Sequence, residues 1–143
     1  AIYADTLILG SSNIGTTTPS VDLTTANNYI TNLQASNISS LSLTNQQDLT
    51  VNATGLSTTG NIALTSTGNI TLNGDITTTN DGSDIGLYAS SNISTENSAK
   101  TITTNNGNIS IIADSDADHD GQLNLDYTTY SAGTGDILLR VKH

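Results

Sequence analysis

The sequence contains no cysteine, methionine, tryptophan or phenylalanine, a single proline, and only three basic residues among 143. Without cysteine, the chain has no disulfide framework, no thiolate metal site and no cysteine nucleophile. Its 13 acidic residues give a net charge of −10, which argues against binding to nucleic-acid phosphates or to an anionic membrane surface. No apolar run approaches the roughly 20 residues of a membrane-spanning helix. We therefore expect neither a nucleic-acid partner nor membrane insertion.

Threonine, serine and asparagine are abundant, at 25, 17 and 17 residues, whereas isoleucine, leucine and valine together number only 33. So few aliphatic side chains cannot fill a thick globular core. Threonine and isoleucine favour strands, asparagine and glycine favour turns, and no helical periodicity is sustained. The composition therefore predicts an all-β fold that is thin and repetitive, organised as a single domain over residues 1–143.

A short motif, consisting of a small residue, Asn or Asp, and Ile, recurs along the chain. Its six copies are Ser12-Asn13-Ile14, Ser36-Asn37-Ile38, Gly60-Asn61-Ile62, Ser83-Asp84-Ile85, Gly107-Asn108-Ile109 and Gly135-Asp136-Ile137. Their Asn or Asp positions are 24, 24, 23, 24 and 28 residues apart. Between the copies, apolar residues alternate with polar ones, as they do in half-buried strands.

A unit of about 24 residues that cannot bury its own apolar face must stack on copies of itself. The repeat therefore predicts a parallel β-helix, or β-solenoid, of about six coils with three short strands each, and right-handed coiling is the default. The recurrent Asn has a structural role in this arrangement, because it tolerates a left-handed corner and its amide can bond to the copy one coil away.

Five asparagines begin Asn-x-Ser/Thr triplets, and the repeat accounts for most of these triplets. They are Asn37, Asn52, Asn69, Asn92 and Asn108. Glycosylation at these positions stays open, but the triplets do not require it.

Three runs, Gly60–Leu64, Gly68–Leu72 and Gly74–Thr77, resemble the repeats of filamentous-haemagglutinin-like proteins, which are large bacterial surface and secreted adhesins. The similarity is clearest from about Leu56 to Leu139, and the secretion domain of that family is not apparent. The resemblance implies a right-handed parallel β-helix, export from the cell, and a stalk or adhesive role. It implies no catalytic residues.

The longest interval between motif copies contains four aspartates at alternate positions, Asp114, Asp116, Asp118 and Asp120, followed by Gly121. Apolar residues on both sides place them in the corner between two strands of the fifth coil. Like charges along one strand would repel, and Asp-x-Asp-x-Asp-Gly matches the start of a calcium loop. The twelfth position is Tyr127 rather than glutamate, so Asp126 or a backbone carbonyl would have to complete the shell. We expect either a calcium site or a solvated acidic loop.

Strand patterns at both ends of the sequence, from Ile2 to Leu9 and from Ile137 to Val141, have no obvious capping helix. They predict end-to-end stacking with further copies, or continuation into a longer adhesin chain. We expect a non-enzymatic, extracellular structural or adhesive protein of a bacterial surface, with host or matrix glycans as further partners.

Two alternatives to this interpretation stay open. A polysaccharide-binding or polysaccharide-cleaving β-helix would need a groove in which Asp lies beside Lys or Arg. An ice-binding solenoid would need an ordered Thr-x-Thr array, but Thr65-x-Thr67, Thr77-x-Thr79 and Thr101-x-Thr103 do not recur at the 24-residue phase.

Overall fold

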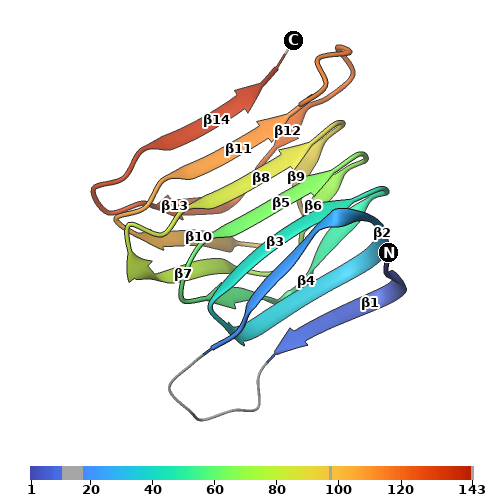
Figure 1. Ribbon diagram of the computed structural model, residues 1–143. Helices are drawn as coiled ribbons and strands as arrows, with labels where there is room; N and C mark the ends of the chain where they lie inside the picture. The colour runs from blue at the N-terminus through green and yellow to red at the C-terminus, as the bar shows by residue number, and fades with distance from the viewer. Residues whose placement is uncertain (11–17, 97, 143) are drawn as a thin grey trace.

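The computed structural model describes residues 1–10, 18–96 and 98–142, and its regular structure over these residues consists of strands. The strands wind into a stack of coils, with β1 (Tyr3–Gly10) and β14 (Ile137–Val141) at opposite ends (Figure 1). The strand pairs are parallel and belong to one 14-stranded sheet. The predicted all-β parallel β-solenoid is therefore confirmed. Within the described residues, no helix has the length and apolar character of a membrane span.

Each coil has three sides, which we call faces 1, 2 and 3. Face 1 stacks β2 (Ser20–Ile38), β3 (Ser40–Asn45), β5 (Ile62–Ser66), β8 (Ile85–Ala89), β11 (Ile109–Ala113) and β14. Face 2 stacks β1, β2, β4 (Leu49–Thr58), β6 (Ile70–Leu72), β9 (Ile93–Thr95) and β12 (Leu123–Asn124). Face 3 stacks the second half of β4 with β7 (Ile76–Asp81), β10 (Lys100–Asn105) and β13 (Thr128–Ser131). These three faces correspond to the three strands per coil that the sequence predicts.

About four turns are present rather than the six predicted. Turns run through β3–β4, β5–β7, β8–β10 and β11–β13, and β1 and β14 supply only partial coils at the two ends. The long strand β2 passes along all three faces, but its pairing with β3 and β4 shifts in register along its length. The motif count overestimated the turns partly because the copy around Asn37 occupies a different side of the coil from the later copies. The copy around Asn13 lies outside the described residues.

Register explains the displaced copy. Ile38 pairs with Thr58 on face 3, whereas Ile62, Ile85, Ile109 and Ile137 share one column on face 1. Coils along that column contain 21, 23, 24 and 28 residues, counted from Leu41 to Ile62 and onward to Ile137. Spacing in the sequence therefore differs from spacing in the stack, because corners of different length separate strands that remain aligned.

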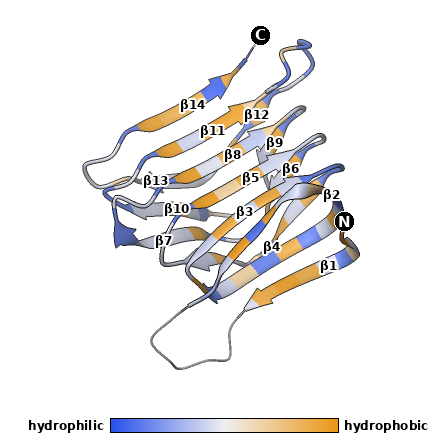
Figure 2. Ribbon diagram, viewed as in Figure 1, coloured by the Kyte–Doolittle hydropathy of each residue, from blue (hydrophilic) through white to orange (hydrophobic). Residues whose placement is uncertain are grey.

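The core is a set of columns in which aliphatic side chains from successive coils lie on one another. On face 1, Ile62 and Ile85 are buried between the equivalent residues of adjacent coils. Figure 2 shows the apolar residues on the strands, including the end strands β1 and β14. Because each apolar residue is covered by the next coil rather than by a second layer, few aliphatic residues suffice for burial.

Several polar side chains that point into the coil are satisfied by the backbone at the corners. Thr58, Thr78 and Thr104 donate hydroxyl hydrogen bonds to the carbonyls of Gly60, Ser83 and Gly107, at 2.5, 3.0 and 2.5 Å. The buried Asn45 side chain accepts from the N–H of Ile30 at 2.8 Å and donates to its carbonyl at 2.9 Å. Satisfied groups of this kind avoid the cost of burying an unpaired polar atom.

The small residue that opens the repeat motif is required by close approach between coils. A Cβ added at Gly107 would lie 1.9 Å from the carbonyl oxygen of Ser83 in the preceding coil. The obstacle is backbone, which cannot rotate away as a side chain would. Glycine at this corner therefore lets consecutive coils stack at the sheet spacing of about 4.8 Å.

Candidate functional site

Two polar features stand out among the described residues: the aspartate loop between β11 and β12, and a groove along face 2. The aspartate loop begins at Asp114, which is fully buried and has a left-handed backbone with φ of 54°. Its Oδ1 accepts the N–H groups of Asp118 and His119, at 3.0 and 3.2 Å. Lys142 donates its Nζ to the Ser115 carbonyl at 3.0 Å. The loop therefore occupies the corner that the sequence predicted and is organised around one buried carboxylate.

Three of the four predicted metal ligands come together in this loop. One carboxylate oxygen each from Asp114, Asp116 and Asp118 lies within 4.8 Å of the other two. The fourth, Asp120, is outside this group and donates its backbone N–H to Asp118 Oδ1 at 3.2 Å. Asp126 is also outside the group. Its carbonyl accepts the Thr95 hydroxyl at 2.7 Å.

Electrostatics in the loop disfavour a further negative charge. The hydrogen bond to Asp118 raises the pKa of the Asp120 carboxyl above its ordinary value, and the charges of Asp118, Asp116 and Asp114 raise it further. A cation bound to the three clustered carboxylates would reverse this effect, because it would neutralise the charges that repel Asp120. Hard oxygen ligands of this kind suit calcium or magnesium.

The recurrent Asn or Asp of the motif forms a column along the corner before face 1. Asn61 Oδ1 accepts the backbone N–H of Asp84 at 2.9 Å, Asp84 Oδ1 that of Asn108 at 2.6 Å, and Asn108 Oδ1 that of Asp136 at 2.9 Å. The expected bond to the copy one coil away is present. Its acceptor is a side-chain oxygen, which explains why Asp and Asn both occur at this position.

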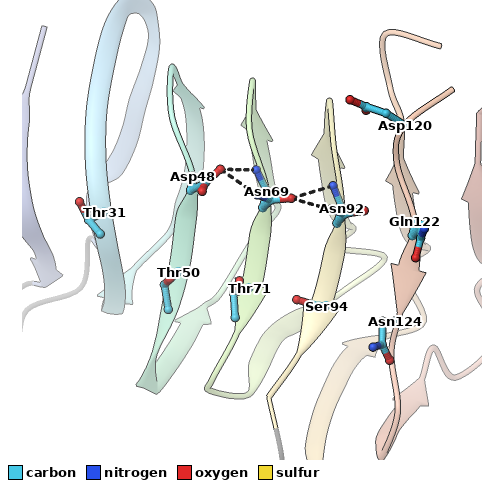
Figure 3. Close-up of a pocket in the computed structure, with 10 residues that line it drawn as sticks. All are labelled: Thr31, Asp48, Thr50, Asn69, Thr71, Asn92, Ser94, Asp120, Gln122 and Asn124. Carbon is cyan, nitrogen blue, oxygen red and sulfur yellow. Dashed lines mark hydrogen bonds between the residues drawn. The ribbon is translucent and has the colours of Figure 1, made fainter. Parts of the chain in front are cut away.

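A second column of this kind forms the edge of face 2, directly before β4, β6 and β9 (Figure 3). Asp48 Oδ1 accepts the backbone N–H and the side-chain Nδ2 of Asn69, at 2.8 and 3.0 Å. Asn69 Oδ1 accepts the same two groups of Asn92, at 3.1 and 2.9 Å. Gln122 follows in the next coil, where its carbonyl accepts the N–H of Ile93. These hydrogen bonds hold the amide groups in fixed orientations.

Beside this column lies a polar groove of about 710 Å³ on the outer surface of face 2. Its lining residues are Thr31, Asp48, Thr50, Asn69, Thr71, Asn92, Ser94, Asp120, Gln122 and Asn124. Asp120 belongs to the aspartate loop, so the two features meet at this residue. Two aspartates line the groove, and no lysine, arginine or aromatic residue does.

The second row of the groove carries free hydrogen-bonding groups. Thr50, Thr71, Ser94 and Asn124 align across four coils, two positions beyond the column. Within the part of the chain that the structure describes, their side chains make no hydrogen bond to the protein. Figure 3 shows them in a line parallel to Asp48, Asn69 and Asn92.

Sequence reasoning did not find this groove, although its signal was present. The sequence marks Asn69-Ile70-Thr71 and Asn92-Ile93-Ser94 as glycosylation triplets, and the first also as part of a haemagglutinin-like run, but not as the lining of a groove. Together with Asp48-Leu49-Thr50 they place an acceptor and a hydroxyl on either side of an inward aliphatic residue, in consecutive coils. The side chains of Asn69 and Asn92 are engaged in the column, which does not favour their glycosylation.

A single column of hydroxyl side chains runs along the outer surface of face 3, although no Thr-x-Thr array recurs there. On face 3, Ser57 pairs with Thr77, Thr77 with Thr103, and Thr103 with Ser131. These four residues form one outward column although they are not evenly spaced in the sequence. Corners of unequal length bring these residues into register, so a fixed 24-residue spacing does not predict their alignment.

The ends of the stack expose part of the apolar interior. Ile85 is fully buried, whereas Ile137 in the same column is 47% exposed because no coil covers it. The other apolar residues packed on the core yet only partly buried are Ile2, Leu7, Leu9, Val21, Leu23, Leu123, Leu125, Tyr130 and Val141. All of them belong to the first or last coils. The predicted terminal strands are present as β1 and β14.

Comparison of the chain with family models, curated proteins and solved structures finds no match. The structure defines the chain as a parallel β-solenoid protein.

Proposed function

We propose that this chain is a non-enzymatic segment of an extracellular rod, on a bacterial surface or secreted, that stacks end to end with further coils. Those coils belong either to a second copy or to a longer adhesin chain of which this is a part. The observation that carries the proposal is the apolar interior, which continues to both ends and is only partly covered there. The resemblance of the Gly-Asn-Ile runs to filamentous-haemagglutinin-like repeats supports the same role.

Register supports stacking between the end of one copy and the beginning of the next. Val21 and Leu23 occupy the inward columns of Leu41 and Leu43 on face 1, and the same columns end at Ile137 and Leu139. A second copy placed one sheet spacing beyond β14 would therefore put Val21 over Ile137 and Leu23 over Leu139. Aliphatic columns and backbone pairing would both continue without interruption.

Charge supports the same arrangement. Arg140 and Lys142, two of the three basic residues, lie on and directly after the last strand. Asp22, on the first strand of face 1, is exposed and would stand diagonally opposite Arg140 of a stacked neighbour. Diagonal partners on adjacent strands are within reach of a long side chain. The pairing would favour one orientation, the end of one copy on the beginning of the next.

The aspartate loop would act as a calcium clip in this rod. Asp114, Asp116 and Asp118 supply three oxygens, and an ion bound to them would crosslink the loop between β11 and β12. Weak calcium sites of extracellular modules have dissociation constants of about 10⁻⁴–10⁻³ M, which suits a loop with only three clustered carboxylates. The role of the ion would be to make that corner rigid.

Negative-stain electron microscopy of the purified chain at high concentration, in calcium buffer, tests the proposal. Long uniform fibres would show stacking of copies, and Leu139→Lys would abolish them because it places a charge in the inward column. Ser110→Lys, on the outward side of β11, is the matched control and should leave the fibres intact. Short isolated rods would instead indicate a longer parent chain.

Hydrogen exchange on the isolated rods then decides whether the ends are open. If the amides of β14 exchange much faster than those of β5, the last coil lacks its cover. Single particles whose β14 amides are as protected as those of β5 would overturn the proposal, because such ends are already capped.

A further inference from the structure

We propose that the groove on face 2 binds a neutral, extended glycan chain that runs along the axis of the stack. This inference deepens the adhesive part of the proposed function by naming the class of ligand. It does not depend on the stacking of copies. It rests on the lining of the groove, on the fixed orientation of one row of side chains and on the free hydrogen-bonding capacity of the other row.

The lining excludes other classes of ligand. Asp48 and Asp120 make the groove acidic and no basic residue lines it, so phosphate, sulfate and uronate groups would be repelled. No apolar side chain lines it either, which leaves nothing to bury a hydrophobic peptide side chain. The coils carrying Asn69 and Asn92 separate the two carboxylates, so they cannot hold one cation together. The strands below are paired on both sides, so no edge is free for an added peptide strand.

The remaining capacity matches hydroxyl-rich chains. Each Asn amide has two N–H donors, and the column uses one of the two on Asn69 and on Asn92. The second donor, the second carboxylate oxygen of Asp48 and the hydroxyls of Thr50 and Thr71 are available. Sugar hydroxyls both donate and accept hydrogen bonds, so they can pair with carboxylate, amide and hydroxyl groups.

Repetition sets the expected length of the ligand. Equivalent groups recur once per coil, about 4.8 Å apart, which is close to the length of one pyranose ring in an extended chain. Four coils contribute to the second row, from Thr50 to Asn124. A chain of about four sugar units would therefore contact every coil. Because no aromatic side chain lines the groove, we expect weak binding. The affinity should nevertheless depend on the length of the glycan.

Saturation-transfer NMR observed on the sugar tests this inference, because it detects weak binding to particles of any length. The probes are neutral cello-, malto- and chito-oligosaccharides of two to six units, with oligogalacturonate as the anionic probe. We expect transfer from at least one neutral series, rising up to four units and then levelling off, and none from oligogalacturonate. No transfer from any neutral series, stronger transfer from the anionic probe, or no dependence on length would overturn the inference.

Matched variants assign the binding to the groove. Thr71→Val with Ser94→Ala removes two hydroxyls from the second row and otherwise changes the size of the side chains little. We expect binding to weaken about fivefold for each lost hydrogen bond. The control, Thr103→Val with Ser131→Ala, makes the same two changes on adjacent coils of face 3 and should bind as the parent chain does. Equal binding by both double variants would refute the groove as the site, provided that both retain the urea midpoint of the parent.

Failure of glycan binding and failure of the proposed rod are distinguishable. The first is measured by saturation transfer on the sugar, and the second by electron microscopy and hydrogen exchange of the chain alone. Loss of fibres through Leu139→Lys should leave binding in the groove unchanged, since the substitution lies on a different face.

Discussion

Two separate substitutions in one aliphatic column, Ile85→Ala and Ile137→Ala, test how far the stability of the stack depends on coverage of each side chain by the next coil. Ile85 and Ile137 share the column and the chemistry, but Ile85 is fully buried and Ile137 is 47% exposed. Ile→Ala removes three carbon groups at about 0.8 kcal/mol each, or about 2.4 kcal/mol for full burial. At Ile85 the cavity left between two coils raises the expected loss of stability to roughly 3–4 kcal/mol.

At Ile137 about half of the transfer free energy is lost, roughly 1 kcal/mol, because solvent already contacts the side chain and no closed cavity forms. Urea unfolding at low protein concentration, followed by circular dichroism, measures both. With a slope of about 2 kcal/mol per molar, the two midpoints should differ by about 1–1.5 M. Equal midpoints would refute the reasoning, because they would mean that Ile137 is covered as fully as Ile85.

Three further predictions concern the polar features. Calcium should raise the unfolding temperature of the parent chain and of Asp22→Asn but not of Asp118→Asn, as followed by circular dichroism; equal shifts in all three would exclude the loop as the site. In an NMR titration of the calcium-free protein from neutral to low pH, Asp120 should protonate before Asp22, because like charges raise the pKa of Asp120 and hydrogen bonds from Thr24 lower the pKa of Asp22. Coincident titration midpoints of Asp120 and Asp22 would contradict this order. A raised pKa means that the folded loop favours the neutral acid, so the loop becomes less stable as the pH rises through the pKa of Asp120 in the folded protein. Asn108→Leu should cost about 1 kcal/mol by removing the acceptor of the Asp136 N–H, whereas Asn108→Asp retains it and should cost less by urea unfolding in high salt, which screens repulsion from Asp84 and Asp136.

The sequence predicted the class of fold because its signals are local. Alternation of Ile and Leu with Thr and Ser specifies short strands wherever the strands are placed, and scarce aliphatic residues require stacking instead of layering. The terminal strands, the corner position of the aspartates and the side-chain bonds between Asn or Asp copies all followed from this pattern. Each depends on neighbours within a few residues or on the bare fact that coils stack.

The number of turns and the groove could not be predicted in the same way. The copy around Asn37 has the same motif as that around Asn61, yet it lies on another face because the intervening corners have different lengths. Counting copies therefore counted coils incorrectly. The hydroxyl column from Ser57 to Ser131 could not be predicted for the same reason, since its members are unevenly spaced in the sequence.

The sequence by itself determined that this protein is a thin all-β stack with polar corners and an acidic loop in one of them. Tertiary structure alone decided which residues share a column. Backbone pairing and buried aliphatic side chains fix the register of each coil on the one before, whatever length of corner lies between. That register brings Asp48, Asn69 and Asn92 into one row beside Asp120, and it is the physical reason that a polar groove exists on face 2.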